Sequence, residues 1–186
     1  PDGGAGIYAE TIRRIREAVP GCSVEVLIPD FKGDEGALAT VLEAGPAILG
    51  HNLETVARLH PDVRPGGRYW RSISYLGASK RIRPDIILKA FTAVEIAFFA
   101  DLYGMTDEQV LRELMAVGLE SIPGGGAEIF ADRVRKKIAN DKADADRYLS
   151  IHAIAHRLGM KTNVTMLFGH IERLDERVDH MVRVRE

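Results

Sequence analysis

Short apolar segments alternate along this chain with longer segments of helical periodicity, and this alternation constrains the fold more than any other feature. The predicted strands cover Ser23–Ile28, Ala47–Gly50, Asp85–Phe91, Ser121–Ile122 and Thr162–Phe168. The predicted helices cover Ile7–Val19, Asp34–Ala44, Trp70–Ile82, Val94–Tyr103, Asp107–Val117, Ile129–Ile138, Arg147–Leu158 and the chain from Asp175 onward. Strands separated by helices pair in parallel through right-handed crossovers, so the sequence predicts an α/β fold with parallel strands.

The predicted strands are short and apolar, as expected when helices cover one face of the sheet and a barrel interior covers the other. We therefore predict a partial (β/α) TIM-type barrel, formed by one domain over residues 1–186. Five strands cannot close an eight-stranded barrel, so we expect the barrel to be incomplete at both ends. An open doubly wound sheet is the alternative.

The segment Glu120–Phe130 contains three consecutive glycines, Gly124, Gly125 and Gly126, after Ser121–Ile122 and Pro123. Glycines admit positive φ and let backbone N–H groups come close to a ligand. A helix resuming at Ala127–Glu128 would add its N-terminal partial positive charge. We interpret this glycine corner as a ligand-binding strand-to-helix turn, while a flexible loop that merely needs room is the alternative.

Polar side chains follow each predicted strand, at positions where the loops of an α/β barrel build the active site. These residues are Asp30, His51, Asn52, Glu54, Thr92, Glu95, Glu128, His170 and Glu172. Taken singly, Asp30, Thr92 and Glu172 are better explained as helix caps or first-turn acids. Their joint pattern favours a site, but it identifies no catalytic residue.

Metal-binding patterns are weak in this sequence. His152 and His156 lie four residues apart in a predicted helix, but no carboxylate base follows them as in zinc proteases, so we expect a packed helix face and no metal site. Cys22 is the one cysteine, which excludes an internal disulfide and a cysteine-held metal cluster within the chain. The run Arg133–Lys137 is interpreted as a solvated helix face.

Charge and hydropathy narrow the class of partner. The formal net charge of −2 gives no electrostatic footprint for nucleic acid or for an acidic membrane surface. No signal peptide or apolar run long enough to span a bilayer is found, so we expect a cytoplasmic protein that acts on a small molecule. The chain starts without Met and ends within a helical pattern, so we expect a piece of a longer protein.

Residues 1 to about 73 resemble lipoyl synthase. The matching words are Pro-Asp-Gly-Gly at 1–4, Val-Glu-Val-Leu-Ile-Pro-Asp-Phe at 24–31, His-Asn-Leu-Glu-Thr at 51–55, and Val-Arg-Pro-Gly at 63–66 leading to Arg71-Ser72. Residues from about 75 to 186 resemble aminofutalosine synthase of the futalosine route to menaquinone. Its words are Lys-Ala-Phe-Thr-Ala-Val-Glu-Ile at 89–96, Pro-Gly-Gly-Gly-Ala-Glu-Ile-Phe at 123–130, Ala-His-Arg-Leu-Gly at 155–159 and Thr-Met-Leu-Phe-Gly-His-Ile-Glu at 165–172.

Both families belong to the radical S-adenosylmethionine superfamily, so the resemblance implies a radical SAM-like partial barrel, S-adenosylmethionine and a [4Fe-4S] cluster. The superfamily cleaves S-adenosylmethionine to a 5′-deoxyadenosyl radical. Lipoyl synthase uses this radical to insert sulfur into an octanoyl chain, and aminofutalosine synthase adds it to an enolpyruvyl benzoate. The resemblance places cofactor contacts at Asn52, Glu54, Arg71, Thr92 and Glu95, and substrate contacts at Gly124, Gly125, Gly126, Glu128 and His170.

The chain departs from the superfamily in one decisive respect, because the Cys-x-x-x-Cys-x-x-Cys motif is absent. Without three thiolates the chain alone cannot hold the cluster, so we expect it to be inactive as given. The two resemblances meet at a seam near residues 70–85, which indicates a recombined or designed chimera, or a fragment. A lipoyl synthase-derived piece and a barrel scaffold without catalysis are the alternatives, and open barrel edges predict self-association.

Overall fold

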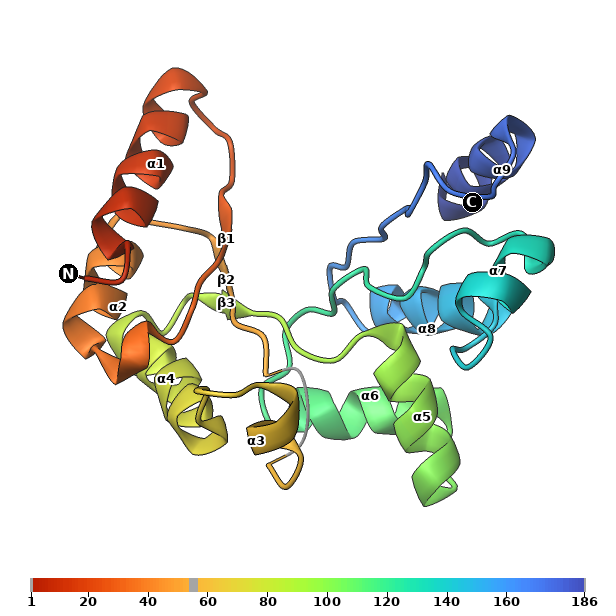
Figure 1. Ribbon diagram of the computed structural model, residues 1–186, viewed down its shortest axis with the longest axis horizontal. Coiled ribbons are helices and arrows are strands. Elements are labelled where there is room, and N and C mark those ends of the chain that lie inside the picture. The colour runs from red at the N-terminus through yellow and green to blue at the C-terminus, as the bar shows by residue number, and fades with distance from the viewer. Residues whose placement is uncertain (1, 54–56, 186) are drawn as a thin grey trace. The chain divides into compact units, whose positions relative to one another are not determined.

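The computed structural model describes residues 2–53 and 57–185 of the chain (Figure 1). The chain divides into two compact units, Pro1–Leu88 and Lys89–Glu186. Unit 1 contains a parallel sheet with flanking helices, and unit 2 is mostly helical. The single domain over residues 1–186 and the seam near 70–85 stay predictions.

Unit 1 follows the predicted alternation of helices and strands closely. Its elements are α1 (Ala5–Ala18), β1 (Glu25–Leu27), the 3-10 turn η1 (Phe31–Gly33), α2 (Glu35–Glu43), β2 (Ile48–Gly50), α3 (His60–Val63), α4 (Tyr69–Ile82) and β3 (Ile87–Leu88). The strands pair in parallel in the order β1-β2-β3, with Ile48 of β2 opposite Glu25 and Ile87. The parallel α/β prediction is therefore confirmed for three strands, whereas a barrel stays a prediction.

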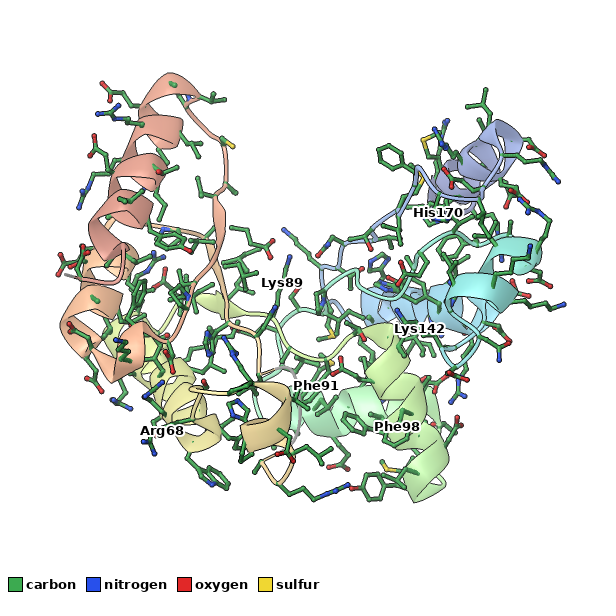
Figure 2. All side chains as sticks on the ribbon, viewed as in Figure 1. Arg68, Lys89, Phe91, Phe98, Lys142 and His170 are labelled. Atoms are coloured by element: carbon green, nitrogen blue, oxygen red, sulfur yellow. The ribbon has the colours of Figure 1, made fainter. Side chains whose placement is uncertain are left out.

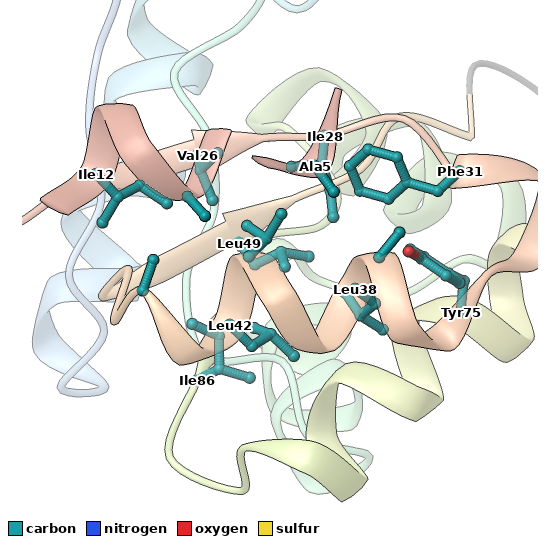
Figure 3. Packing of buried hydrophobic residues seen from close by; sticks show 14 of the residues in the cluster. Ala5, Ile12, Val26, Ile28, Phe31, Leu38, Leu42, Leu49, Tyr75 and Ile86 are labelled. Atoms are coloured by element: carbon teal, nitrogen blue, oxygen red, sulfur yellow. The ribbon is translucent and has the colours of Figure 1, made fainter. Parts of the chain in front are cut away.

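The core of unit 1 forms where the helices cover the sheet (Figure 3). Ala5, Ala9 and Ile12 recur at helical spacing on α1 and are buried, so this face packs against the unit. Leu38 and Leu42 of α2 are buried in the same cluster. Small alanines on α1 allow close approach of the helix.

Side chains with capping bonds lie at the starts of α1 and α2 in unit 1. The carboxylate of Asp2 accepts the N–H groups of Gly4 at 3.0 Å and Gly6 at 2.7 Å, at the start of α1. Asp34 is the N-cap of α2 and accepts the N–H groups of Gly36 and Ala37. Such caps satisfy donors that the first helical turn leaves unpaired.

Unit 2 contains α5 (Ala93–Tyr103), α6 (Asp107–Ala116), α7 (Asp132–Ile138), α8 (Ala145–Arg157) and α9 (Leu174–Arg185). One isolated parallel bridge joins Lys89 to Ser121. The buried cluster of this unit includes Ile96, Leu111, Ile122, Phe130 and Tyr148. The Thr-Asp-Glu-Gln pattern at residues 106–109 predicts a capping box, and Thr106 and Gln109 form one at the start of α6.

The strand predicted over Thr162–Phe168 is wrong, because this segment belongs to no strand of the described chain. Side-chain hydrogen bonds and one backbone bond, from the Leu167 N–H to the carbonyl of Glu128, hold it where a ladder would be expected. Ser121 Oγ donates to the carbonyl of Lys161 at 2.7 Å, and Lys89 Nζ donates to Oδ1 of Asn163 at 2.8 Å. The segment is short and ends in a run of apolar residues, Met166 to Phe168, which suggested a strand.

The helix predicted over Ile129–Ile138 begins later than expected, at Asp132. Glu128 has φ 49°, a left-handed conformation that cannot belong to a helix of L-residues. Its carbonyl oxygen accepts the N–H of Leu167 at 3.0 Å, so it is not available to a helical donor. The glycine corner therefore does not lead directly into a helix.

Helix α9 has an unusual distribution of side chains. Glu176 and His180 are buried, whereas Leu174 is 73% exposed and Met181 is 53% exposed. The face of α9 that is buried against the rest of unit 2 is thus its polar face. Within the described part of the chain, no helix combines the length and the apolar character needed to cross a membrane.

Cys22 lies in the link between α1 and β1, three residues before the strand, where its thiol is exposed.

Candidate functional site

The carboxyl ends of β1 and β2 carry a cluster of polar contacts around Asp30. Oδ2 of Asp30 accepts Nε of Arg71 at 2.6 Å, and its Oδ1 accepts the N–H of Lys32 at 3.0 Å. Burial opposes ionisation of this carboxyl, but the two donors outweigh it and hold the pKa of Asp30 below its ordinary value. Asp30 is therefore a carboxylate that fastens α4 to the end of β1.

His51 at the end of β2 is a buried link between three elements. Its Nδ1 lies 2.8 Å from the carbonyl oxygen of Ile28, and its Nε2 lies 2.8 Å from Oγ of Ser72. A carbonyl can only accept, so Nδ1 donates to Ile28, while the Ser72 hydroxyl can serve Nε2 as donor or acceptor. Both nitrogens are satisfied, which favours a positioning role for His51.

A pocket of about 500 Å³ opens beside the Asp30–Arg71 pair. Its lining comes from the start of the chain, the end of β1 with η1, the loop before α4, and α4 itself. The lining residues are Asp2, Gly3, Pro29, Asp30, Phe31, Lys32, Asp34, Arg64, Pro65, Gly66, Gly67 and Arg71. Its volume is in the range of small-molecule sites.

The backbone is strained at the ends of the strand segments. Phe31 and Lys32 have φ 41° and 58°, Phe91 has φ 57°, and Glu128 has φ 49°. These residues follow β1, β3 and the bridged residue Ser121. Left-handed conformations of non-glycine residues cost energy and gather at functional sites, so they mark these corners as candidates.

Three cofactor contacts were predicted in unit 1. Arg71 lines the pocket, as a cofactor contact would. Asn52 is exposed, and its backbone carbonyl accepts a guanidinium N–H of Arg64. Glu54 lies outside the described residues.

Thr92 and Glu95 lie together at the start of α5, where they form a capping box. Oε2 of Glu95 accepts the N–H of Thr92 at 2.6 Å and its hydroxyl at 3.0 Å. The carboxylate thus already has two donors within the chain. The helix-cap interpretation accounts for both side chains, and their predicted contact with a cofactor stays a prediction.

The glycine corner packs tightly against its neighbours in unit 2. A Cβ on Gly124 would lie 2.7 Å from the carbonyl oxygen of Asn163, and a Cβ on Gly126 would overlap Cγ2 of Val94. The carbonyl of Gly124 also accepts the hydroxyls of Tyr148 at 2.7 Å and Thr165 at 2.6 Å. Close packing alone therefore requires glycine at Gly124 and Gly126.

The N–H groups of Gly125 and Gly126 find no acceptor within the described chain. Both residues are partly exposed. These two donors keep the ligand-binding interpretation of the corner open beside the packing interpretation, since backbone N–H groups in a glycine turn can bind an anion.

Arg135 of α7 holds the chain that follows the glycines. Its buried guanidinium donates to the carbonyls of Gly126 at 3.3 Å and Ala127 at 2.6 Å, and also to the carbonyl of Ala143. Burial lowers the pKa of Arg135. The prediction of a solvated face over Arg133–Lys137 is therefore wrong at Arg135, because charged positions on a short helix gave no sign of these carbonyl partners.

Glu128 and His170 are brought together through Leu167. The Leu167 N–H donates to the carbonyl of Glu128, and the Leu167 carbonyl lies 2.9 Å from Nε2 of His170. The carboxylate of Glu128 pairs with Nζ of Lys142 at 2.6 Å. Figure 2 labels Lys142 and His170 on the two segments that carry these contacts.

Glu172 closes the turn that carries His170. Its carboxylate accepts the N–H groups of Gly169 at 2.6 Å and His170 at 3.0 Å, and it pairs with Arg177. These bonds, the Gly169 N–H above all, lower the pKa of Glu172 to about 2. Contacts within the chain therefore account for Glu172, as capping bonds account for Asp30 and Thr92.

His152 and His156 share the hydroxyl of Thr162, which lies 2.8 Å from Nδ1 of His152 and from Nε2 of His156. His152 is buried, and His156 is exposed. Burial and the neighbouring His156 lower the pKa of His152 to about 4. Among the residues that the structure describes, no group of three or more His, Cys, Asp or Glu side chains could hold a metal ion.

The structure thus forms two partial sites. Unit 1 carries Arg71 with Asp30, while unit 2 carries Thr92 with Glu95, the glycine corner, and Glu128 with His170. Their convergence on one cavity stays a prediction. Sequence reasoning missed Lys32 and Arg135, for which no pattern existed, and Arg64, which lies in a matching word but was assigned no role.

No protein-family model matches the chain. The chain is 48% identical over 126 residues to aminodeoxyfutalosine synthase of Thermus thermophilus, a match that covers 68% of the chain and 33% of that protein. It is 46% identical over 114 residues to lipoyl synthase of Rubrobacter xylanophilus, covering 61% of the chain and 33% of that protein. It is also 39% identical over 127 residues to a 5-amino-6-(D-ribitylamino)uracil–L-tyrosine 4-hydroxyphenyl transferase of Methanopyrus kandleri, covering 68% of the chain and 34% of that protein.

The two families predicted from the sequence are therefore homologues of parts of this chain. The chain spans about a third of the length of these relatives. The two first matches, of 126 and 114 residues, together exceed the chain length of 186, so they share residues. A common stretch that resembles both families lies within the chain.

Proposed function

We propose that this chain, whose homologues aminodeoxyfutalosine synthase and lipoyl synthase are radical S-adenosylmethionine enzymes, forms the nucleoside- and substrate-binding part of such an enzyme. The observation that carries this proposal is the 48% identity over 126 residues to an aminodeoxyfutalosine synthase. The proposed substrate is accordingly an enolpyruvyl benzoate, to which the 5′-deoxyadenosyl radical is added.

The [4Fe-4S] cluster of this chemistry does not fit the residues present. Such a cluster is held by cysteine thiolates, and the chain has one cysteine, Cys22, which is exposed in the link before β1. We propose that the chain by itself generates no radical. Its contribution is then binding and orientation of the organic ligands.

Two features support a binding role. The pocket of about 500 Å³ in unit 1 contains Arg71, which the resemblance assigns to S-adenosylmethionine. In unit 2, the glycine corner offers two backbone N–H groups that find no acceptor within the described residues, a geometry suited to a carboxylate. S-adenosylmethionine and an enolpyruvyl benzoate both carry carboxylates.

Calorimetric titration of the purified chain with S-adenosylmethionine tests the proposal. We expect saturable binding at millimolar ligand or below, and weaker binding of adenosine, which lacks the carboxylate. Absence of heat with S-adenosylmethionine at millimolar concentration would reject the binding role. Anaerobic incubation with iron and sulfide is expected to give a colourless protein, and a brown protein with a cluster spectrum would contradict the proposal that the chain by itself holds no cluster.

A lipoyl synthase-derived function is the second candidate, favoured by the 46% identity over 114 residues to lipoyl synthase of Rubrobacter xylanophilus. It predicts that an octanoyl-lysine peptide binds in preference to 3-[(1-carboxyvinyl)oxy]benzoate. Competition between these two ligands separates the candidates. Binding of neither ligand and no S-adenosylmethionine binding would indicate a scaffold without catalysis.

A further inference from the structure

His180 of α9 is a buried histidine of which only one ring nitrogen has a partner. The residue is 2% exposed, and its Nε2 lies 3.1 Å from the carbonyl oxygen of Thr165. A carbonyl can only accept, so Nε2 carries a proton and donates the hydrogen bond. Nδ1 is buried and finds no hydrogen-bond partner within the described part of the chain. The neutral ring therefore fits this place, whereas a second proton, on Nδ1, would have no acceptor there.

The ring of His180 lies against an aromatic face that already has a cation beside it. It stacks on Phe130, with 4.1 Å between the ring centroids and 19° between the ring planes. The guanidinium of Arg183 lies 5.3 Å from the centroid of the same Phe130 ring. A protonated His180 would bring a second positive charge to this ring, so Phe130 stabilises it less than an unoccupied aromatic ring would.

The charged groups around His180 belong to α9 and α7, because residues 162–168, which include its partner Thr165, carry none. Those that act on the ring are Asp179, Arg183 and Arg135. Burial lowers the pKa of His180, and the two arginines lower it further, whereas the Thr165 carbonyl and Asp179 favour the charged ring. The lowering effects prevail, so α9 docks with His180 neutral.

Helix α9 is held on unit 2 mainly by polar contacts. Its buried residues are Glu176 and His180, so the docked face buries little apolar surface. Glu176 pairs with Arg133 at 2.6 Å, and Arg183 pairs with Asp146. The Arg133 guanidinium holds the pKa of Glu176 below its ordinary value, so this ion pair persists in mild acid. With little apolar burial, the docking of α9 depends on whether the contact of His180 stays favourable.

The carbonyl that His180 holds belongs to a residue packed against the glycine corner. The Thr165 hydroxyl donates to the Gly124 carbonyl at 2.6 Å. A Cβ on Gly124 would lie 2.8 Å from the backbone nitrogen of Thr165, so the two backbones are in close contact. A movement of α9 away from Thr165 therefore removes one support of the segment that holds the corner.

We propose that His180 makes the docking of α9 pH-dependent: the neutral ring fastens α9 to Thr165, and protonation of Nδ1 releases α9 and loosens the glycine corner before the rest of unit 2 unfolds. In the released form His180 meets water and regains its ordinary pKa of 6.5, so a proton binds the released form more readily than the docked one. The docked form is therefore fully favoured above pH 6.5 and loses population as the pH falls below this value. This inference goes beyond the proposed function, since it does not depend on which ligand the chain binds.

Amide hydrogen exchange of the ¹⁵N-labelled full chain, measured by NMR at about pH 7.5 and about pH 5 and corrected for intrinsic exchange rates, tests the proposal. We expect the protection factors of α9 to fall about tenfold between these pH values, to a level below those of α8. His180→Gln is expected to remove this fall, because its amide can still donate to the Thr165 carbonyl and does not titrate. His156→Gln, which removes an exposed histidine from the same unit, is the matched control and should keep the fall.

The outcomes separate release of α9 from unfolding of the whole unit. A fall that persists in His180→Gln would overturn the proposal, as would equal protection of α9 and α8 at both pH values, which would indicate one unfolding unit. Loss of the α9 effect in His152→Gln would assign it to the other buried histidine. Amide signals of Gly124, Gly125 and Gly126 that do not change with the midpoint of α9 release would overturn the link to the corner.

The unmodified chain supplies a second test, which decides the question if α9 is already unprotected in His180→Gln. The ¹⁵N shifts of the His180 ring report its protonation directly. We expect the Nε2–H tautomer at about pH 7.5, and we expect protonation of the ring and release of α9 to share one pH midpoint. A protonated His180 in an α9 that keeps its protection would overturn the proposal.

Discussion

Nε of Arg71 lies 2.6 Å from Oδ2 of Asp30, and this ion pair joins the first turn of α4 to the carboxyl end of β1. Both side chains are largely buried, at 24% and 16% exposure. The pair therefore stabilises unit 1 and also fixes one wall of its pocket. These two roles can be separated by experiment.

Asp30→Asn is expected to destabilise unit 1 by about 1–3 kcal/mol, because it leaves the Arg71 guanidinium partly buried without its charged partner. Urea unfolding of unit 1, followed through the amide NMR signals of α2, measures the change. The pKa of Asp30 is depressed on folding, so its stabilisation is present above the unfolded pKa and is lost as pH falls through the folded value. In Asp30→Asn, the part of the loss of stability at low pH that comes from Asp30 should disappear.

Asp85→Asn is the matched control for this change, because Asp85 also pairs with an arginine but its side chain is 74% exposed. We expect little change in the urea midpoint. Equal loss of stability in both variants would show that the Asp30–Arg71 pair has no special weight.

Gly124→Ala is expected to destabilise unit 2 by about 1–3 kcal/mol, because its methyl group would meet backbone atoms of Asn163 and Thr165 that cannot move aside independently. Gly125→Ala is the comparison, since its methyl group would lie 3.2 Å from Cγ2 of Thr92, a side-chain atom. Amide hydrogen exchange of α8 measures both changes. A larger effect at Gly125 would contradict the packing explanation of the corner.

Thr92→Ala is expected to cost about 1 kcal/mol by removing the cap of α5. Thr106→Ala removes the same kind of capping box from α6 and should cost a similar amount. If Thr92 also touches S-adenosylmethionine, its variant alone will weaken ligand binding in calorimetry. Equal binding by both variants would assign Thr92 a capping role only.

Acid is expected to destabilise unit 2 through His152. Burial and the neighbouring His156 lower its pKa from 6.5 to about 4, so the unfolded chain binds a proton more readily than the native one. The contribution of the neutral His152 ring to the free energy of unfolding is fully present above pH 6.5. It falls by about 3 kcal/mol in total as the pH drops toward 4. Burial lowers the pKa of His180 as well, which adds in the same direction.

His152→Gln should flatten this dependence, since an amide can still contact the Thr162 hydroxyl and does not titrate. Exposed His156→Gln serves as the control. The exchange rates of α8 amides at pH 6.5 and at lower pH measure the effect. A steep acid dependence that persists in His152→Gln would assign it to other groups.

The edge of the sheet is expected to promote self-association. β1 stands at one end of the strand order, and Leu27 on it is 56% exposed. An exposed apolar edge strand can pair with another chain. Light scattering should detect oligomers that Leu27→Lys reduces, whereas a monodisperse monomer of the unmodified chain would reject the prediction.

The sequence predicted α1, α2, α4 and the three strands of unit 1 to within a few residues because three signals agree there, but it did not predict η1 or the short helix α3. On α1, α2 and α4, helical periodicity, stop signals such as Pro20-Gly21 and the intervening apolar strands all indicate the same boundaries. The capping box at Thr106 likewise has a local pattern. Parallel pairing followed from the alternation of these elements.

The sequence could not predict features that depend on contacts between distant residues. Thr162–Phe168 has strand-like composition, but Ser121 and Lys89 hold it through side chains. Glu128 adopts a left-handed conformation that composition does not reveal. Arg135 resembles its exposed neighbours in sequence, and only the positions of the Gly126, Ala127 and Ala143 carbonyls explain its burial.

The isolated, solvent-facing thiol of Cys22 makes the chain a ready spectroscopic reagent. A maleimide dye attached there would occupy one defined position in unit 1, with no competing cysteine to remove by mutation. A second cysteine introduced on an exposed turn of α9 would then allow a donor and an acceptor to be placed on the two units. Energy transfer between them would measure, in solution, the separation of the two halves and its response to a nucleoside.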